Sequence, residues 1–141
     1  MATINASINI TSDIAYSGFS LSKTMTMTKA DTATGIENTN GLGVKKLAAT
    51  TAVVLELAAD ATASGANKLY IRNTGSNKAE HVKISFNASA SADTTTENIG
   101  RLYGGDWMLI PWEANGTTHN VVASPSTADE VTTIEYMTFH E

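Results

Sequence analysis

The chain has no cysteine, few aromatic residues and few charges for its length of 141 residues. The lack of cysteine excludes a disulfide framework, a thiolate zinc site and a thiol nucleophile. Charged residues make up 16% of the chain, against roughly 25% in typical soluble domains. Thr, Ser and Asn replace them, so we expect a polar but largely uncharged surface. Stability must then come from packing, hydrogen bonding or assembly.

Basic clusters and long hydrophobic runs are also missing. The formal net charge is -5, and the one basic pair, Lys45 and Lys46, is too small to replace the counterions of a nucleic acid. The longest apolar stretch, residues 48–59, is interrupted by polar residues and is unsuited to span a bilayer. The first ten residues have no pattern of a secretory signal. We therefore expect a protein made in the cytoplasm, with no nucleic-acid partner and no membrane partner.

What the sequence does contain is alternation of apolar and polar residues, which is typical of half-buried strands. Ile4, Ala6, Ile8 and Ile10 alternate with polar residues. The clearest run follows, where odd positions carry Phe19, Leu21, Met25 and Met27 and even positions carry Ser or Thr. This second segment should have one apolar and one hydroxyl face.

The rest of the chain predicts short strands separated by turn residues. Residues 31–43 lack a sustained period and suggest a linker or long loop. Residues 52–57 fit a strand better than a short helix. Residues 68–73 and 80–86 predict a hairpin around residues 74–78. Further strands are expected at 98–103, 107–112, 119–124 and 130–140. We predict an all-β fold, an antiparallel β-sandwich of about eight strands, with a jelly roll as one option. Residues 1–34 would form an extended arm or strand, and residues 35–141 the sandwich body.

No motif for catalysis, cofactor binding or metal binding stands out. His81, His119 and His140 lack the spacing of a metal site, and Asp93 and Glu97 lack the ligand pattern of a calcium loop. Neither a nucleophile elbow nor a nucleotide-binding loop occurs. Paired carboxylates remain open, because they are set by space rather than by sequence. We therefore expect no enzyme, no catalytic residue, no cofactor and no metal.

The aromatic residues gather around Gly104 and Gly105, with Tyr103, Trp107 and Trp112 close by in the chain. In a strand, Trp107, Leu109 and Pro111 would share one face, and Met108, Ile110 and Trp112 the other. Both faces are apolar, whereas a sandwich strand has one core-facing side, so the second face should be covered by a partner subunit or by the arm. The alternative is a stacking platform for a sugar ring.

The segment from residue 19 to 28 would be about 33 Å long if extended. It is either an ordinary sheet strand or an arm that adds to a neighbour's sheet. Met25 and Met27 suit such a contact, because unbranched thioethers fill irregular gaps. The candidate interface residues are Phe19, Leu21, Met25, Met27, Trp107 and Trp112.

Several segments together resemble a known family of proteins. They are the Ile-rich start, SLSKTMTMT, a Gly-containing connector, NKLYIRNTGSNKAEHVKISF, WMLIPW and the terminal IEYMTFHE. This strand pattern resembles small virion structural proteins of tailed bacteriophages, and most of all a capsid decoration (cement) protein. The resemblance implies a β-sandwich that assembles, often as a trimer, on the head surface of the virion and stabilises the lattice there. Its partners would be the major capsid protein and copies of itself. Alternatives are a tail or baseplate subunit, and a carbohydrate-binding or receptor-binding module.

Overall fold

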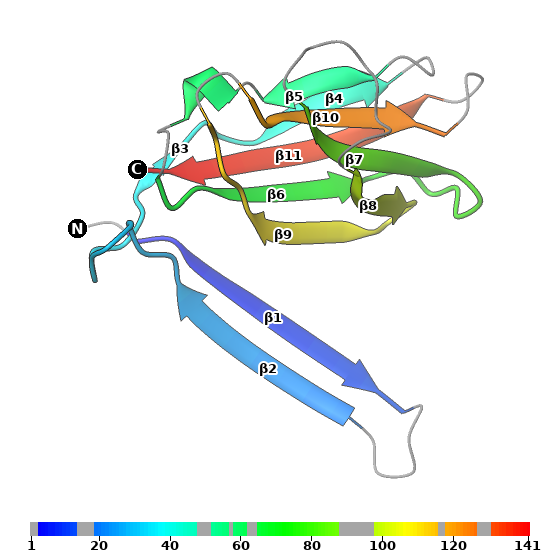
Figure 1. Ribbon diagram of the computed structural model, residues 1–141. Coiled ribbons are helices and arrows are strands. Elements are labelled where there is room, and N and C mark those ends of the chain that lie inside the picture. Colours follow the sequence, from blue (N-terminus) through cyan, green and yellow to red (C-terminus); the bar gives the residue numbers. More distant parts are fainter. Residues whose placement is uncertain are drawn as a thin grey trace. The chain divides into compact units, whose positions relative to one another are not determined.

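The computed structural model describes residues 3–13, 19–47, 52–56, 58–61, 65–87, 98–115, 118–126 and 131–141, apart from the side chains of Phe19 and Asn87. The regular structure of these residues is β-strand, apart from one short 3-10 turn, η1 (Ala58–Asp60). The chain divides into two compact units, Met1–Glu37 and Asn38–Glu141. The first is called here the hairpin unit and the second the body (Figure 1).

The hairpin unit is built on β1 (Asn5–Ser12) and β2 (Phe19–Thr26), which pair antiparallel. Directly opposite residues share a face of the ribbon. The register places Ala6 opposite Met25, Ile8 opposite Lys23 and Ile10 opposite Leu21. The alternating positions are Ser, Thr or Asn throughout. The predicted apolar and hydroxyl faces are therefore confirmed, with Lys23 as the one charge on the apolar face.

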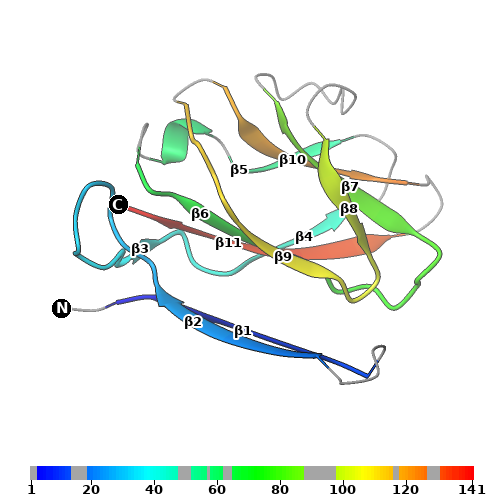
Figure 2. The same ribbon diagram turned by 60° about the horizontal axis from the view of Figure 1, so that its bottom comes forward.

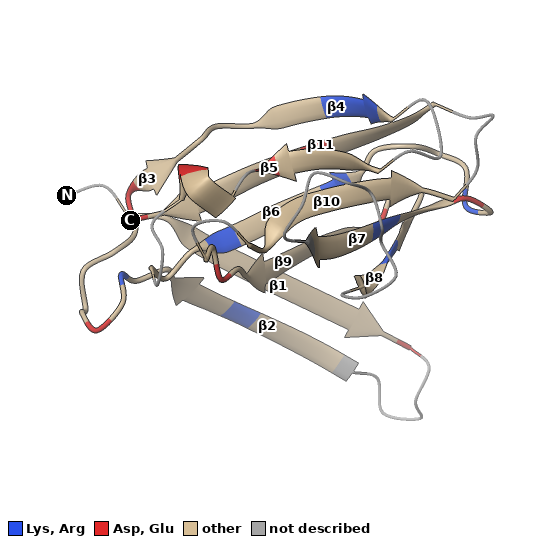
Figure 3. Cartoon of the chain, turned by 45° about the horizontal axis from the view of Figure 1, so that its top comes forward, with Lys and Arg blue, Asp and Glu red and all other residues tan. Residues whose placement is uncertain are grey.

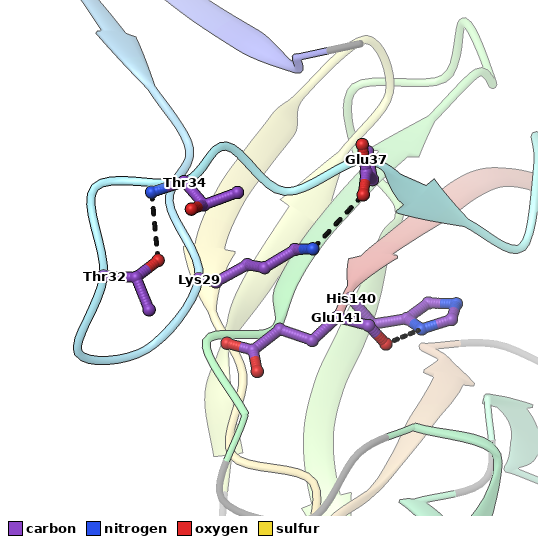
Figure 4. A network of polar contacts seen from close by, with 6 residues as sticks. All are labelled: Lys29, Thr32, Thr34, Glu37, His140 and Glu141. Atoms are coloured by element: carbon purple, nitrogen blue, oxygen red, sulfur yellow. Dashed lines mark hydrogen bonds and ion pairs between the residues drawn. The ribbon is translucent and has the colours of Figure 1, made fainter. Parts of the chain in front are cut away.

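Residues 27–37 close the base of the hairpin unit. The Ile36 N–H donates to the Met27 carbonyl at 2.7 Å, and the Met27 N–H donates to the Ile4 carbonyl at 2.9 Å. Lys29 Nζ lies 3.2 Å from Glu37 Oε1 (Figure 4). A Cβ on Gly35 would lie 2.7 Å from Thr3 Cγ2, so glycine permits this close approach. The expected linker or long loop over 31–43 agrees with residues 31–37, which contain no strand, although backbone hydrogen bonds tie this loop to the hairpin. Its second half differs, because Asn38–Thr39 form a short strand.

The body consists of two antiparallel sheets (Figures 1 and 2). The four-stranded sheet has the order β5 (Val53–Glu56), β10 (Asn120–Pro125), β7 (His81–Asn87), β8 (Asn98–Tyr103). The five-stranded sheet has the order β3 (Asn38–Thr39), β11 (Thr132–His140), β6 (Lys68–Asn73), β9 (Trp107–Pro111). Its fifth strand, β4 (Gly43–Leu47), also pairs with β11, on the same edge as β3. The expected strand at residues 52–57 is confirmed as β5, although Leu57 lies outside the described residues.

The core lies between these sheets and is filled by alternate residues of each strand. Leu69 and Ile71 of β6, Val82 and Ile84 of β7, and Ile134 of β11 are all fully buried in one cluster. Inward-facing apolar residues from both sheets are the defining property of a sandwich. The predicted all-β sandwich is therefore confirmed. The described residues form nine strands in the body and two in the hairpin, so the count of about eight is not confirmed, and the jelly-roll topology stays a prediction.

The predicted hairpin of residues 68–73 and 80–86 is wrong. Strand β6 pairs with β11 and β9, whereas β7 pairs with β10 and β8. The connection crosses between the sheets, and the Thr74 N–H donates to the Thr133 carbonyl at 2.9 Å as the chain leaves β6. Both strands carry buried residues at alternate positions. These rows meet across the core, from one sheet to the other.

Candidate interaction surfaces

The first candidate surface is the apolar face of the hairpin, defined as Ala6, Ile8, Ile10, Leu21 and Met25. Ile10 is 48% exposed and Met25 is 49% exposed. On the opposite face, Ser7 and Thr24 share a hydrogen bond of 2.7 Å, and Thr26 Oγ1 donates to Asn5 Oδ1 at 2.8 Å. Two cross-strand pairs of the hydroxyl face thus hydrogen-bond to each other, while the apolar face leaves hydrocarbon exposed.

The structure places the predicted arm residues differently from one another. Leu21 and Met25 lie on the apolar face of the hairpin. Met27 follows β2 and is only 2% exposed, so it does not contribute an exposed contact. Phe19 begins β2, and its side chain lies outside the described part of the chain.

The second candidate surface is the outer face of the five-stranded sheet. The pairing of β6 with β9 sets Tyr70 opposite Leu109 and Arg72 opposite Trp107. On the other side of β6, Met137 and Glu135 of β11 lie opposite the same two β6 residues. We define the outer face as Tyr70, Arg72, Trp107, Leu109, Glu135 and Met137. An antiparallel sheet usually presents polar residues to solvent, and this one presents a mixed, largely apolar row.

Polar contacts on the outer face centre on Tyr70. Its hydroxyl donates to Glu135 Oε1 at 2.8 Å. Burial raises the pKa of Tyr70, and the hydrogen bond to Glu135 adds to this shift. A shallow depression beside it is lined by Tyr70, Arg72, Gly105 and Trp107. Trp107, at 51% exposed, contributes the largest exposed ring of this face.

Strand β9 has the two faces that its sequence predicts. Met108 and Ile110 pack against the core, and Trp112, immediately beyond the strand, is 1% exposed within it. Trp112 Nε1–H donates to the His119 carbonyl at 2.9 Å. A platform made from both tryptophans is therefore not formed, because β-strand geometry directs Trp107 outward and Trp112 inward. Trp112 belongs to the core and is not an exposed interface residue.

Tyr103 and the histidines are not among the residues of these two surfaces. Tyr103 ends β8 in the four-stranded sheet, with its ring centroid 5.3 Å from that of His81. Burial lowers the pKa of His81, and the nearby Arg101 and Lys83 charges lower it further. Among the described residues, no group of three or more His, Cys, Asp or Glu side chains could hold a metal ion. Asp93 and Glu97 lie outside the described residues.

A hydrogen-bond network that the sequence did not predict joins the two sheets. Asn40 Nδ2–H donates to Glu56 Oε1 at 2.6 Å, and His140 Nε2 lies 2.9 Å from Asn40 Oδ1. Burial raises the pKa of Glu56, the Asn40 hydrogen bond lowers it, and the Asp60 charge raises it again. These residues are far apart in sequence, so no local motif could have identified the network. It links β5 to β11.

Charged side chains are scattered over several elements of the chain (Figure 3), with Lys45 and Lys46 adjacent on β4. Within the described ranges, no helix has the length and apolar character needed to cross a membrane.

No protein-family model, curated protein or solved structure matches this chain. The two apolar surfaces are thus the strongest candidates for a functional site.

Proposed function

We propose that the protein is a virion structural protein that binds the outside of a phage head and stabilises the major capsid lattice. The observation that carries the proposal is the hairpin unit, a separate β-ribbon with Ile10 and Met25 half exposed on one face. An exposed apolar ribbon in addition to a sandwich body suits a protein whose contact surface is its function. The strand pattern that resembles capsid decoration proteins supports the same role.

The proposed mechanism is reinforcement across the junctions between capsid subunits. Each ribbon would bury apolar area at about 25 cal/mol for each Å² removed from water. Strand edges could add backbone hydrogen bonds to a neighbouring sheet. Because a head carries many copies, a modest free energy for each contact raises the free energy needed to separate the lattice. The partners in this proposal are the major capsid protein and other copies of the chain.

Binding to heads provides the test. Purified protein is mixed with expanded heads that lack it, and we measure cosedimentation and the temperature at which the heads break open. We expect binding and a higher disruption temperature. The Met25→Lys variant should bind more weakly, while Ser22→Lys, on the hydroxyl face of the same strand, should bind like the wild type. If the wild type neither cosediments with the heads nor raises their disruption temperature, the proposal is contradicted.

A second candidate is a carbohydrate-binding or receptor-binding module, and one observation favours it. Trp107 is half exposed beside Tyr70 and Arg72, around a shallow depression, and an exposed indole ring can stack on a sugar. A glycan array followed by tryptophan fluorescence titration tests it. Because Trp112 is buried, a fluorescence change abolished by Trp107→Phe would support sugar binding. No response across a broad glycan panel counts against it.

A tail or baseplate subunit would have the same fold and a different location. Immuno-electron microscopy of intact particles separates the two, because decoration predicts label over the head and a tail subunit predicts label over the tail.

A further inference from the structure

We infer that copies of this chain assemble by arm exchange, in which the apolar face of one hairpin docks on the outer face of the five-stranded sheet of a second copy. The inference rests on the proposed assembly function. It assigns the apolar face of the hairpin to a contact between copies, so that the linked copies together bind the head. That contact joins two copies of this chain, so it can be tested without capsids.

The hairpin requires a cover. A two-stranded ribbon is at best marginally stable alone in water. Its apolar face carries Ile10 and Met25 at about half exposure, and the register lines them up with Ile8 and Leu21 along one side. Because the opposite face carries only Ser, Thr and Asn, which water can hydrate, the apolar face is the side that gains from docking.

The outer face of the five-stranded sheet is a matching surface. Met137, Tyr70 and Leu109 form a continuous row across three neighbouring strands. Trp107 stands half exposed at the edge strand, and a large aromatic ring of this kind is a typical anchor of a protein interface. The surface is wide enough for a ribbon of two strands, which spans about 10 Å.

The link between the units favours a second copy as the occupant. The hairpin unit is held together up to Glu37 by its ion pair with Lys29 and by the Ile36–Met27 hydrogen bond. Strand β3 starts at Asn38, the next residue. The link between the two units is therefore short, and short hinges promote exchange between copies.

The area is sufficient for a stable contact. A ribbon of eight residues per strand is about 26 Å long and about 10 Å wide, so one face covers about 260 Å². Reciprocal docking of two ribbons on two sheets buries on the order of 1,000 Å² in total, which reaches the lower bound of a specific interface. Exchange around a closed ring of copies satisfies every arm and leaves none open.

Sedimentation measurements of mass test the contact. We expect the wild type to be a dimer or a closed higher oligomer. Met25→Lys and Trp107→Ala should each raise its dissociation constant by about tenfold or more. The matched controls are Ser22→Lys on the hydroxyl face and Ile99→Ala on β8, and neither should change it. Circular dichroism verifies that each variant is folded.

Cross-linking identifies the occupant, and the cysteine-free sequence makes single labels clean. Ile10→Cys and Leu109→Cys chains of different mass are mixed and joined with a flexible bismaleimide. We expect products that contain one chain of each kind. In a doubly substituted chain, cross-links within one chain as the only product would overturn the inference. A monomeric wild type, or an oligomer unchanged by both Met25→Lys and Trp107→Ala, would overturn it as well.

The head-binding experiment fails separately from this one. An intact oligomer that does not bind heads contradicts the decoration function and leaves arm exchange supported. A monomer that binds heads contradicts arm exchange and leaves decoration supported.

Discussion

At the residue scale, Asn73 holds the end of β6 against the turn between β8 and β9. Its Nδ2–H donates to the Leu102 carbonyl at 3.0 Å, and its Oδ1 accepts the Gly75 N–H at 2.9 Å. The Gly105 N–H donates to the Asn73 carbonyl at 2.9 Å. A buried amide with its hydrogen bonds satisfied fixes geometry. This contact therefore joins the two sheets where the chain crosses between them.

Glycine at position 104 is required by the same close approach. A Cβ there would lie 2.5 Å from the Asn77 carbonyl oxygen and 2.8 Å from the Gly75 carbonyl oxygen. Because backbone atoms cannot move aside cheaply, Gly104→Ala should lower the free energy of unfolding by about 1–3 kcal/mol. Urea denaturation measures the change. The control is Gly100→Ala, where the nearest atom is Met108 Cε at 4.0 Å, and equal losses in both variants would contradict this packing.

Glu56 should make the body less stable as it ionises. Burial raises its pKa above the ordinary value of 4.5, so between 4.5 and that raised pKa the folded state holds a proton that the unfolded state releases. Stability then falls as pH rises through this window. Glu56→Gln removes the ionisation and keeps an acceptor for Asn40. We expect a higher melting temperature than the wild type at neutral pH and none of this gain below pH 4.5.

The control for Glu56 is Glu113→Gln, because Glu113 is exposed. This variant should melt like the wild type at both pH values. A gain for Glu56→Gln that persists unchanged in acid would show that packing, rather than ionisation, causes it.

At the element scale, the sequence predicted the faces of strands better than their partners. Alternation reports which side a residue points to, and it identified both faces of the segment from Trp107 to Trp112 and the two faces of β2. It does not report which strand lies alongside. The prediction of a hairpin around residues 74–78 was wrong because turn residues of this kind also suit a crossing between sheets. The contacts that direct the crossing, such as the hydrogen bond from Thr74 to Thr133, are long-range in sequence.

Deletion of residues 1–37 should leave the body folded. In the described part of the chain, the hairpin strands pair only with each other, and both body sheets are complete without them. We expect a β-type circular dichroism spectrum and one cooperative unfolding transition, together with loss of the oligomer. A truncated protein that is insoluble or unfolded would instead make the hairpin an integral part of the fold.

At the scale of the whole molecule, the candidate surfaces were only partly predictable. Leu21, Met25 and Trp107 were predicted from the apolar pattern of their strands, and the structure leaves Met25 and Trp107 about half exposed. Met27 and Trp112 were included by the same criterion and are buried, since alternation cannot distinguish an interface from a core. The hydrogen-bond network from Glu56 to His140 was missed because β5 and β11 both reach Asn40 only after folding.

The response of the oligomer to salt should reveal which force holds it together. The surfaces assigned to arm exchange are mainly apolar, with Lys23 as the only charge on the hairpin side. Ion pairs weaken as sodium chloride screens them, whereas sulfate strengthens apolar burial because it is excluded from protein surfaces. We therefore expect the dissociation constant to change little with sodium chloride and to fall with sodium sulfate, as measured by sedimentation. Association should also show a negative heat-capacity change in calorimetry. A dissociation constant that rises about tenfold or more with sodium chloride would mean that charges, rather than the apolar faces, join the copies.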